Sequence, residues 1–268
     1  MTKRKLTPIT LLHYIKLICR SLLLLAALGG YIFYRVKNSK GIFEGNEGYA
    51  FAVLGIIWLL YVTDIIWLLY VTEMAIRFFP SRFESMGCGK QFKRNYEPTG
   101  EEKPRLQSPK RTLAVILAWL GLNGVIAALY YLGVIDRGIL VLITLTYGVC
   151  DMICILFFCP FQTWFMKNRC CGVCRIYNWD FAMMFTPLVL IPHAYTWSLL
   201  GLSLILLLRW EITYRLHPER FSETTNACLS CGRCEEKLCH HKKQLLRFWE
   251  KNKEKLKNYL PTGKGQRK

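Results

Sequence analysis

Two groups of cysteines carry the clearest chemistry in this 268-residue chain. One group lies in a short basic stretch and reads Cys-Cys-x2-Cys, and the other lies in the polar C-terminal part and reads Cys-x2-Cys-x2-Cys-x4-Cys. Two thiolates two residues apart can bind one tetrahedral metal ion from a single turn. We therefore predict that the metal ligands are Cys170, Cys171, Cys174, Cys228, Cys231, Cys234 and Cys239.

Structural zinc is the metal that this spacing favours. The first group supplies too few ligands for a closed four-coordinate site, so one pair from each group would complete it and fasten the two stretches together. An iron–sulfur cluster is the alternative, because Cys-x2-Cys-x2-Cys begins the bacterial ferredoxin pattern. That pattern continues with x3-Cys-Pro, whereas Cys239 follows after four residues and precedes His240. Reactive thiols and transient metal delivery also remain open.

The elements that must position these cysteines are membrane helices. The chain is 53% hydrophobic, and its apolar residues form long blocks separated by basic loops. We predict an all-α integral membrane bundle with about six transmembrane segments. The expected parts are a basic N-terminal segment (1–14), transmembrane segments 1 and 2 (15–79), a loop (80–111), transmembrane segments 3 and 4 (112–161), a cysteine-rich loop (162–180), transmembrane segments 5 and 6 (181–210) and a cysteine-rich, basic tail (211–268).

The last apolar block contains Pro187 and Pro192, which predict a break. We expect a short fifth segment that ends at Pro192 and a sixth segment after the turn. One long tilted helix is the alternative, and it would place the tail on the opposite side of the membrane.

Charged residues interrupt the first two apolar blocks, and three of them are informative. Arg20 lies inside the first block, where we expect its long side chain to snorkel to the nearer interface. In the second block, IIWLLYVTD over residues 56–64 is followed at once by IIWLLYVTE over residues 65–73. Asp64 therefore corresponds to Glu73, and we interpret it as a product of a tolerated duplication in preference to an ion or proton site.

The distribution of basic residues predicts the topology. The chain has 36 basic and 18 acidic residues and a net charge of +18. The N-terminus, the loop over residues 80–111, the cysteine-rich loop and the tail hold most of the Lys and Arg. This bias predicts a plasma-membrane protein with both termini cytoplasmic, and it accounts for the charge without a nucleic-acid partner. The cysteine groups would then face a reducing compartment, which disfavours disulfides.

The remaining features suggest packing and surface contacts. We interpret Cys150 and Cys154 as helix-packing residues and Cys88 as a bystander in a polar, partly disordered loop. Residues 238–260 form a basic amphipathic pattern suited to an anionic membrane surface or a partner protein. Its apolar positions are Leu238, Leu245, Trp249, Leu256 and Leu260. We identify no catalytic residue.

Three stretches resemble an uncharacterised family of bacterial multi-pass membrane proteins. They are CPFQTWF over residues 159–165, CCGVCRIYNWD over residues 170–180 and the Cys-x2-Cys of the tail. The resemblance implies the multi-pass architecture and no particular activity. Two functional classes follow from the residues: a membrane scaffold or partner subunit with a structural zinc knot, and a membrane redox protein that uses an iron–sulfur centre or a thiol pair.

Overall fold

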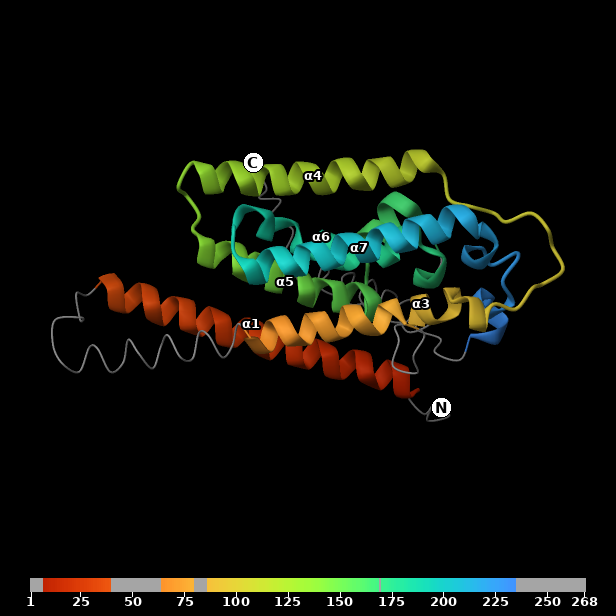
Figure 1. Ribbon diagram of the computed structural model, residues 1–268, viewed down its shortest axis with the longest axis horizontal. Helices are drawn as coiled ribbons and strands as arrows, with labels where there is room; N and C mark the ends of the chain where they lie inside the picture. The colour runs from red at the N-terminus through yellow and green to blue at the C-terminus, as the bar shows by residue number, and fades with distance from the viewer. Residues whose placement is uncertain (1–6, 40–63, 80–85, 169, 235–268) are drawn as a thin grey trace, which may run out of the picture.

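The computed structural model describes residues 7–39, 64–79, 86–168 and 170–234 (Figure 1). Over these residues the chain is helical and contains no strand, only an isolated bridge between Pro98 and Asn226. The all-α prediction is confirmed. The helices are α1 (Pro8–Ser39), an unlabelled helix over residues 64–78, α3 (Met86–Gln91), α4 (Pro109–Tyr131), α5 (Arg137–Leu156), α6 (Asp180–Phe185) and α7 (Ala194–Leu216).

Three helices are long and apolar enough to cross a membrane. They cover Pro8–Val36, Pro109–Tyr131 and Arg137–Leu156. Only 6% of the first span and 11% of the second are buried within the protein, against 39% of the third. The exposed leucines of α1 and α4 therefore suit contact with lipid, whereas α5 lies at the centre of the bundle (Figure 1). These helices support a membrane protein, and the count of six spans stays a prediction.

The last apolar block is broken as predicted. After α6 the chain forms a 3-10 helix over Thr186–Leu190, turns, and begins α7 at Ala194. The first half of the block is thus short, and its side chains Phe181, Met184 and Phe185 are buried in the main core. Because α6 packs against both α5 and α7, this half of the block lies inside the bundle between these two helices.

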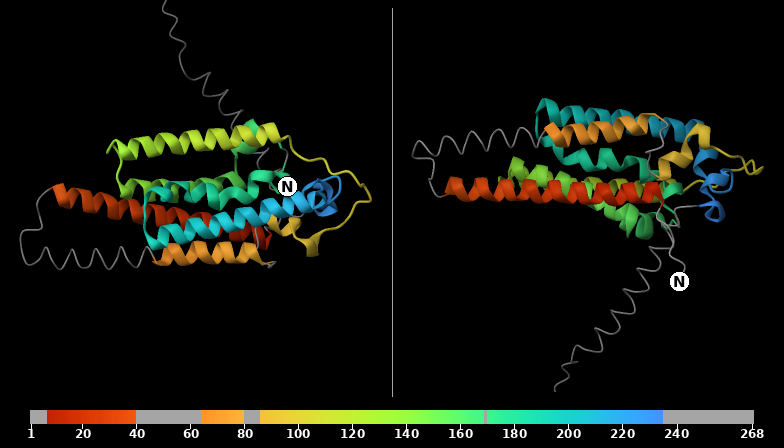
Figure 2. Two further views of the ribbon diagram at one scale, coloured as in Figure 1. Left: turned by 45° about the horizontal axis from the view of Figure 1, so that its top comes forward. Right: turned by 90° about the horizontal axis from the view of Figure 1, so that it is seen from below.

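One end of the bundle collects segments that are far apart in the sequence. The start of α1, α3, the cysteine-rich loop and residues 218–234 all lie there, as both views show (Figure 2). We call this the loop end. The arrangement agrees with the prediction that these segments share one side of the membrane.

The loop over residues 86–111 is more ordered than predicted. It contains α3 and a 3-10 helix over Lys93–Asn95. The Ala227 amide donates to the Glu97 carbonyl at 2.8 Å, and the Asn226 side chain donates to the Lys90 carbonyl at 3.0 Å. The expectation of disorder is wrong for these residues, because their hydrogen-bond partners come from a segment more than a hundred residues later in the chain.

Several predicted features lie outside the described residues. They are Cys239, the amphipathic stretch over residues 238–260, residues 1–6 of the basic N-terminal segment and the first copy of the duplication apart from Asp64. In the described part, Asp64 is exposed at the start of its helix segment.

Candidate functional site: a thiol cavity beside a buried charge cluster

Arg20 is buried, with 3% of its surface exposed. Its guanidinium donates to Glu73, to Asp151 at 3.2 Å and to the Gly148 carbonyl at 2.9 Å. It also lies 5.2 Å from the ring centroid of Tyr70. The expectation that Arg20 snorkels to the interface is wrong, because two carboxylates from other helices satisfy it inside the bundle.

Further ion pairs extend this buried charge cluster. The Lys16 ammonium lies 3.4 Å from Glu73 Oε1. Arg77 pairs with Asp180 at 2.5 Å and 2.6 Å, through both nitrogens and both oxygens. The cluster therefore holds three basic and three acidic groups. Buried charges are costly without partners, and this balance accounts for how six of them coexist in an apolar bundle.

Gly148 allows the close packing around this cluster. A Cβ atom at this position would lie 2.5 Å from the Tyr70 hydroxyl oxygen and 3.0 Å from the Met184 sulfur. No side chain larger than hydrogen fits without moving a neighbour. The glycine thus lets Tyr70 reach α5, while its carbonyl stays available to Arg20.

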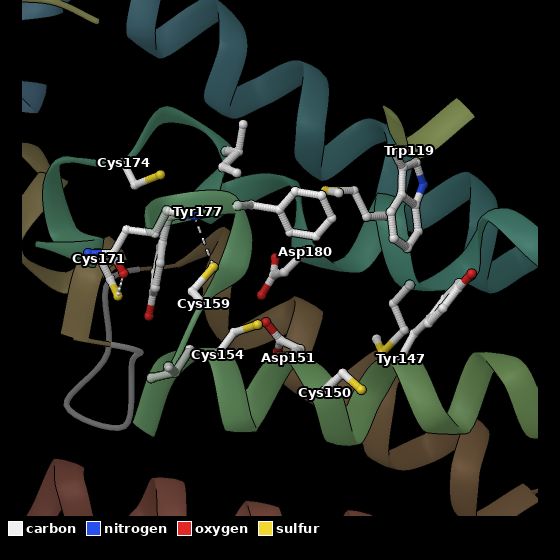
Figure 3. A pocket seen from close by; sticks show the side chains of 16 residues that line it. Trp119, Tyr147, Cys150, Asp151, Cys154, Cys159, Cys171, Cys174, Tyr177 and Asp180 are labelled. Atoms are coloured by element: carbon white, nitrogen blue, oxygen red, sulfur yellow. Dashed lines mark hydrogen bonds between the residues drawn. The ribbon is translucent and has the colours of Figure 1, made fainter. Parts of the chain in front are cut away.

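A cavity of about 120 Å³ lies beside the cluster, near the loop end (Figure 3). Its walls come from α4, α5, α6 and the cysteine-rich loop, and they are mainly apolar and aromatic. Trp119 and Tyr147 close one end, with their ring centroids 4.8 Å apart. The thiols and carboxylates that line the cavity belong to Cys150, Cys154, Cys159, Cys171, Cys174, Asp151 and Asp180.

Cys154 and Cys159 are paired at the centre of this cavity. Both thiols line the cavity, although Cys154 belongs to the last turn of α5 and Cys159 follows the end of that helix. The Gln162 amide donates to the Cys159 sulfur at 3.3 Å (Figure 3). This amide belongs to the first turn of a π-helix over Phe161–Met166. Amides at a helix start stabilise a thiolate, so Cys159 is the better placed of the two to carry negative charge.

The two carboxylates in the cavity differ in their hydrogen bonding. Both oxygens of Asp180 are held by Arg77, and one also accepts from the Phe181 amide. Asp151 uses one oxygen, Oδ2, to accept from Arg20. Its Oδ1 has no hydrogen-bond partner among the described residues, and the side chain lies next to the Cys154 thiol (Figure 3). Asp151 can therefore accept a proton, whereas Asp180 is fully engaged.

The loop cysteines that line the cavity behave as neutral thiols. Cys171 donates to the Gln162 side-chain oxygen at 3.0 Å. Burial raises the pKa of Cys174 to about 12, and its neighbour Cys171 acts in the same direction. A thiol of this kind is a poor nucleophile at neutral pH. These two residues therefore differ from the Cys154–Cys159 pair.

The two predicted metal-ligand groups are brought close together without forming a site in the described part of the chain. Leu229 of the tail packs over Gly172, at 3.4 Å from where a Cβ atom would lie. Cys234 accepts from the Lys90 ammonium at 3.3 Å. Burial, and then the nearby Glu97, raise the pKa of Cys228. No group of three or more His, Cys, Asp or Glu side chains among the described residues is placed to hold a metal ion. The metal site thus stays a prediction, with Cys239 outside the described residues.

Sequence reasoning missed the members of the thiol cavity. We expected Cys154 to be a packing residue and Cys88 a bystander. Cys154 instead lines the cavity, and Cys88 is fully buried and donates to the Asn178 side-chain oxygen at 2.7 Å. The Cys159-Pro160 pair at the end of an apolar block could have indicated this site. Proline ends the helix there, and a cysteine beside it is a reactive side chain at the helix end.

No protein-family model, curated protein or solved structure matches this chain.

Proposed function

We propose that this protein is a multi-pass membrane redox protein that works through the thiol pair Cys154 and Cys159. One observation carries the proposal: two thiols, Cys154 and Cys159, line the same cavity as a carboxylate oxygen, Asp151 Oδ1, that is available to accept a proton. A cysteine pair held only for packing does not require such an acceptor beside it.

The reaction that suits this geometry is thiol–disulfide exchange with a disulfide-bearing partner. The Cys159 thiolate attacks one sulfur of the partner disulfide, which forms a mixed disulfide and releases the first partner thiolate. Cys154 then loses its proton to Asp151 and attacks the Cys159 sulfur, which releases the second partner thiolate. The proton that Cys159 releases when its thiolate forms and the proton that Asp151 takes from Cys154 pass to the two leaving thiolates, and Asp151 returns to its ionised form. The protein is oxidised by two electrons, and the partner is reduced by two.

We place this site at the cytoplasmic end of a bundle of six transmembrane segments, with both termini cytoplasmic and the bundle in the plasma membrane. The excess of Lys and Arg in the segments that meet at the loop end supports this orientation. The basic stretch over residues 238–260 would add a contact with the anionic membrane surface or with a partner protein.

The test is disulfide formation in native membranes. Membranes are exposed to oxidised glutathione, alkylated and digested, and the peptide that contains both Cys154 and Cys159 is analysed by mass spectrometry. We expect this peptide to lose the mass of two hydrogens and to escape alkylation. Because oxidised glutathione does not cross membranes, inverted vesicles should react and intact cells should not.

Matched variants complete this test. Cys154→Ser and Cys159→Ser should each abolish the intramolecular disulfide, and Cys159→Ser should also prevent the mixed disulfide with glutathione. Cys150→Ser removes a thiol of the same cavity and should leave the reaction unchanged. A reduced pair in wild-type inverted vesicles would refute the redox function, and reaction from outside intact cells would refute the orientation.

A membrane scaffold or partner subunit with a structural zinc knot is the second candidate. The contact of Leu229 with Gly172 supports it, because the segments that carry the two cysteine groups touch. Zinc thiolate ligands would then come from both segments. An iron–sulfur cluster in the same ligands is the alternative, and anaerobic purification would distinguish it by its visible absorption. Stoichiometric zinc in the purified protein would support this second candidate, and its absence would refute the zinc knot.

A further inference from the structure

A second, larger hollow lies on the outer side of the bundle between α4, α6 and α7. Its volume is about 540 Å³, which is within the range of about 300–1,000 Å³ that small-molecule sites occupy. The hollow shares Trp119 and Met183 with the thiol cavity, which lies on the other side of these two side chains. We call it the α4–α7 groove.

The groove is apolar along its length and charged at its loop end. Its apolar walls include Leu113, Ile116, Leu204 and Leu207. The charged residues are Arg175, Glu211 and Arg215. Arg175 and Glu211 form a pair at 2.5 Å and 3.2 Å, which leaves the positive charge of Arg215 uncompensated within the described residues. An apolar channel with a cationic end matches an amphiphile whose head group is anionic.

The start of α4 adds to this positive end. Pro109 and Thr112 line the groove, and the first turn of α4 contains Lys110 and Arg111 but no acidic residue. The N-terminus of a helix carries a partial positive charge, so these basic residues are unfavourably placed unless an anion lies nearby. The Thr112 hydroxyl is moreover buried without a hydrogen-bond partner.

The level of this charged end in the bundle identifies the source of the anion. The membrane-span candidate Pro109–Tyr131 begins at the same residue that lines the charged end of the groove. The charged end therefore lies where phospholipid head groups meet the hydrocarbon region, and the apolar walls extend from there into the hydrocarbon. We infer that the α4–α7 groove binds a phospholipid with an anionic head group, with an acyl chain along α4 and α7 and the phosphate near Arg215.

The experiment measures bound lipid by native mass spectrometry. The detergent-solubilised full chain is incubated with an equimolar mixture of phosphatidylglycerol and phosphatidylcholine of the same acyl composition. We expect preferential binding of phosphatidylglycerol. Arg215→Gln should reduce this preference roughly fivefold, because one basic residue at a membrane surface strengthens the binding of an anionic lipid by about that factor. Arg105→Gln, an equivalent change at an exposed residue outside the groove, should leave it unchanged.

A filling variant tests the acyl part of the inference. Leu204 lines the groove and is 45% exposed, so Leu204→Trp can occupy the groove without disturbing the core. We expect it to lower the binding of both lipids. Equal binding of the two lipids to the wild type, or a preference unchanged in Arg215→Gln, would overturn the inference. So would displacement of phosphatidylglycerol by excess inorganic phosphate, since that would indicate a simple anion site. The thiol exchange reaction is measured separately, so neither result decides the other.

Discussion

Asp151 and Asp180 line the same cavity, yet their hydrogen bonds give them different chemistry. Arg77 holds both oxygens of Asp180, and Arg20 holds only one oxygen of Asp151. A carboxylate that is held on both sides keeps its charge and its position. One with an available oxygen beside a thiol can take up and return a proton. The number of guanidinium contacts thus distinguishes a structural carboxylate from a candidate proton acceptor.

Replacing each aspartate with asparagine tests this distinction. We expect Asp151→Asn to slow disulfide formation between Cys154 and Cys159 by about a hundredfold, the lower end of what a positioned proton acceptor contributes. The measurement is the rate of the peptide mass change with oxidised glutathione.

Asp180→Asn is the matched control for that measurement. It leaves Arg77 incompletely paired, so it should lower the thermal stability of the protein and leave the exchange rate of the folded fraction unchanged. Equal rates in wild type and Asp151→Asn would remove Asp151 from the mechanism and leave the thiol pair standing. Equal slowing by both substitutions would show that stability, and not proton transfer, limits the reaction.

Residue types could be predicted from the sequence here, but their partners could not. The charge of Arg20 inside an apolar block was evident, and a buried arginine requires a carboxylate. Glu73 and Asp151 lie 53 and 131 residues away, however, and no periodicity connects positions on different helices. The cysteine spacing likewise directed attention to Cys170 and its neighbours, because local spacing can be detected whereas the approach of Cys159 to Cys154 depends on how α5 ends.

At the scale of elements, the hairpin between α4 and α5 depends on Asp136. This residue caps the N-terminus of α5 by accepting from the Ile139 amide at 2.9 Å, and it also accepts from the Tyr31 hydroxyl at 2.9 Å. Partial burial acts to raise the pKa of Asp136, but the hydrogen bonds from Ile139 and Tyr31 outweigh it, so the pKa lies below its ordinary value of 3.8. The carboxylate thus joins α5 to α1 as well as capping it.

Asp136→Ala should lower the free energy of unfolding by about 1 kcal/mol at neutral pH, as the loss of a helix cap does. Because folding lowers the pKa of Asp136, its stabilisation is fully present above the ordinary value and is lost as the pH falls through the lowered value. The difference between wild type and variant should therefore narrow in strong acid. Thermal unfolding in detergent at several pH values measures this.

Asp136→Asn separates the cap from the charge. Asparagine caps helices about as well as aspartate, so this variant should keep most of the stability at neutral pH while losing the pH dependence. An Asp136→Ala variant as stable as wild type at neutral pH would show that the cap contributes nothing.

The order of elements was more predictable than their exact lengths. The break after Pro192 was predicted because proline marks it directly. The first helix instead begins at Pro8, ahead of the predicted start at residue 15, and ends at Ser39. The fifth segment contributes only a six-residue helix and a 3-10 turn, and its side chains Phe181, Met184, Phe185 and Leu188 are buried in the main core.

For the whole molecule, the loop end is where the sequence-distant segments meet. Asn226 bonds to the carbonyls of Lys90 and Arg220, and the Gln91 side chain donates to the Gly172 carbonyl at 2.6 Å. The three segments thus hold one another in place through backbone groups. The sequence predicts that the tail is fastened to the cysteine-rich loop by shared metal ligands. The participation of α3 could not be predicted, because nothing in its polar sequence marks it as buried.

The double substitution Cys171→Ser with Cys174→Ser tests whether a shared metal adds to this docking. If one zinc is bound by both cysteine groups, we expect the variant to lose the metal and its tail to be cleaved faster by protease, since thiolate–metal bonds contribute folding energy directly. Metal content by mass spectrometry and the rate of proteolysis are the two measurements. Cys150 is exposed on α5, and the variant Cys150→Ser is the control. Unchanged metal and an equally protected tail would refute the shared site.

The buried position of Arg20 has a consequence for biosynthesis. Its two carboxylate partners lie 53 and 131 residues later in the chain. At a translation speed of about 5–20 residues per second, the second partner is made roughly 7–26 s after Arg20. The first helix must therefore meet the insertion machinery with an unneutralised guanidinium, at a cost of about 2.5–3.5 kcal/mol if it enters the bilayer alone. Its final placement is thus a late event, completed when the helices that carry Glu73 and Asp151 arrive beside it.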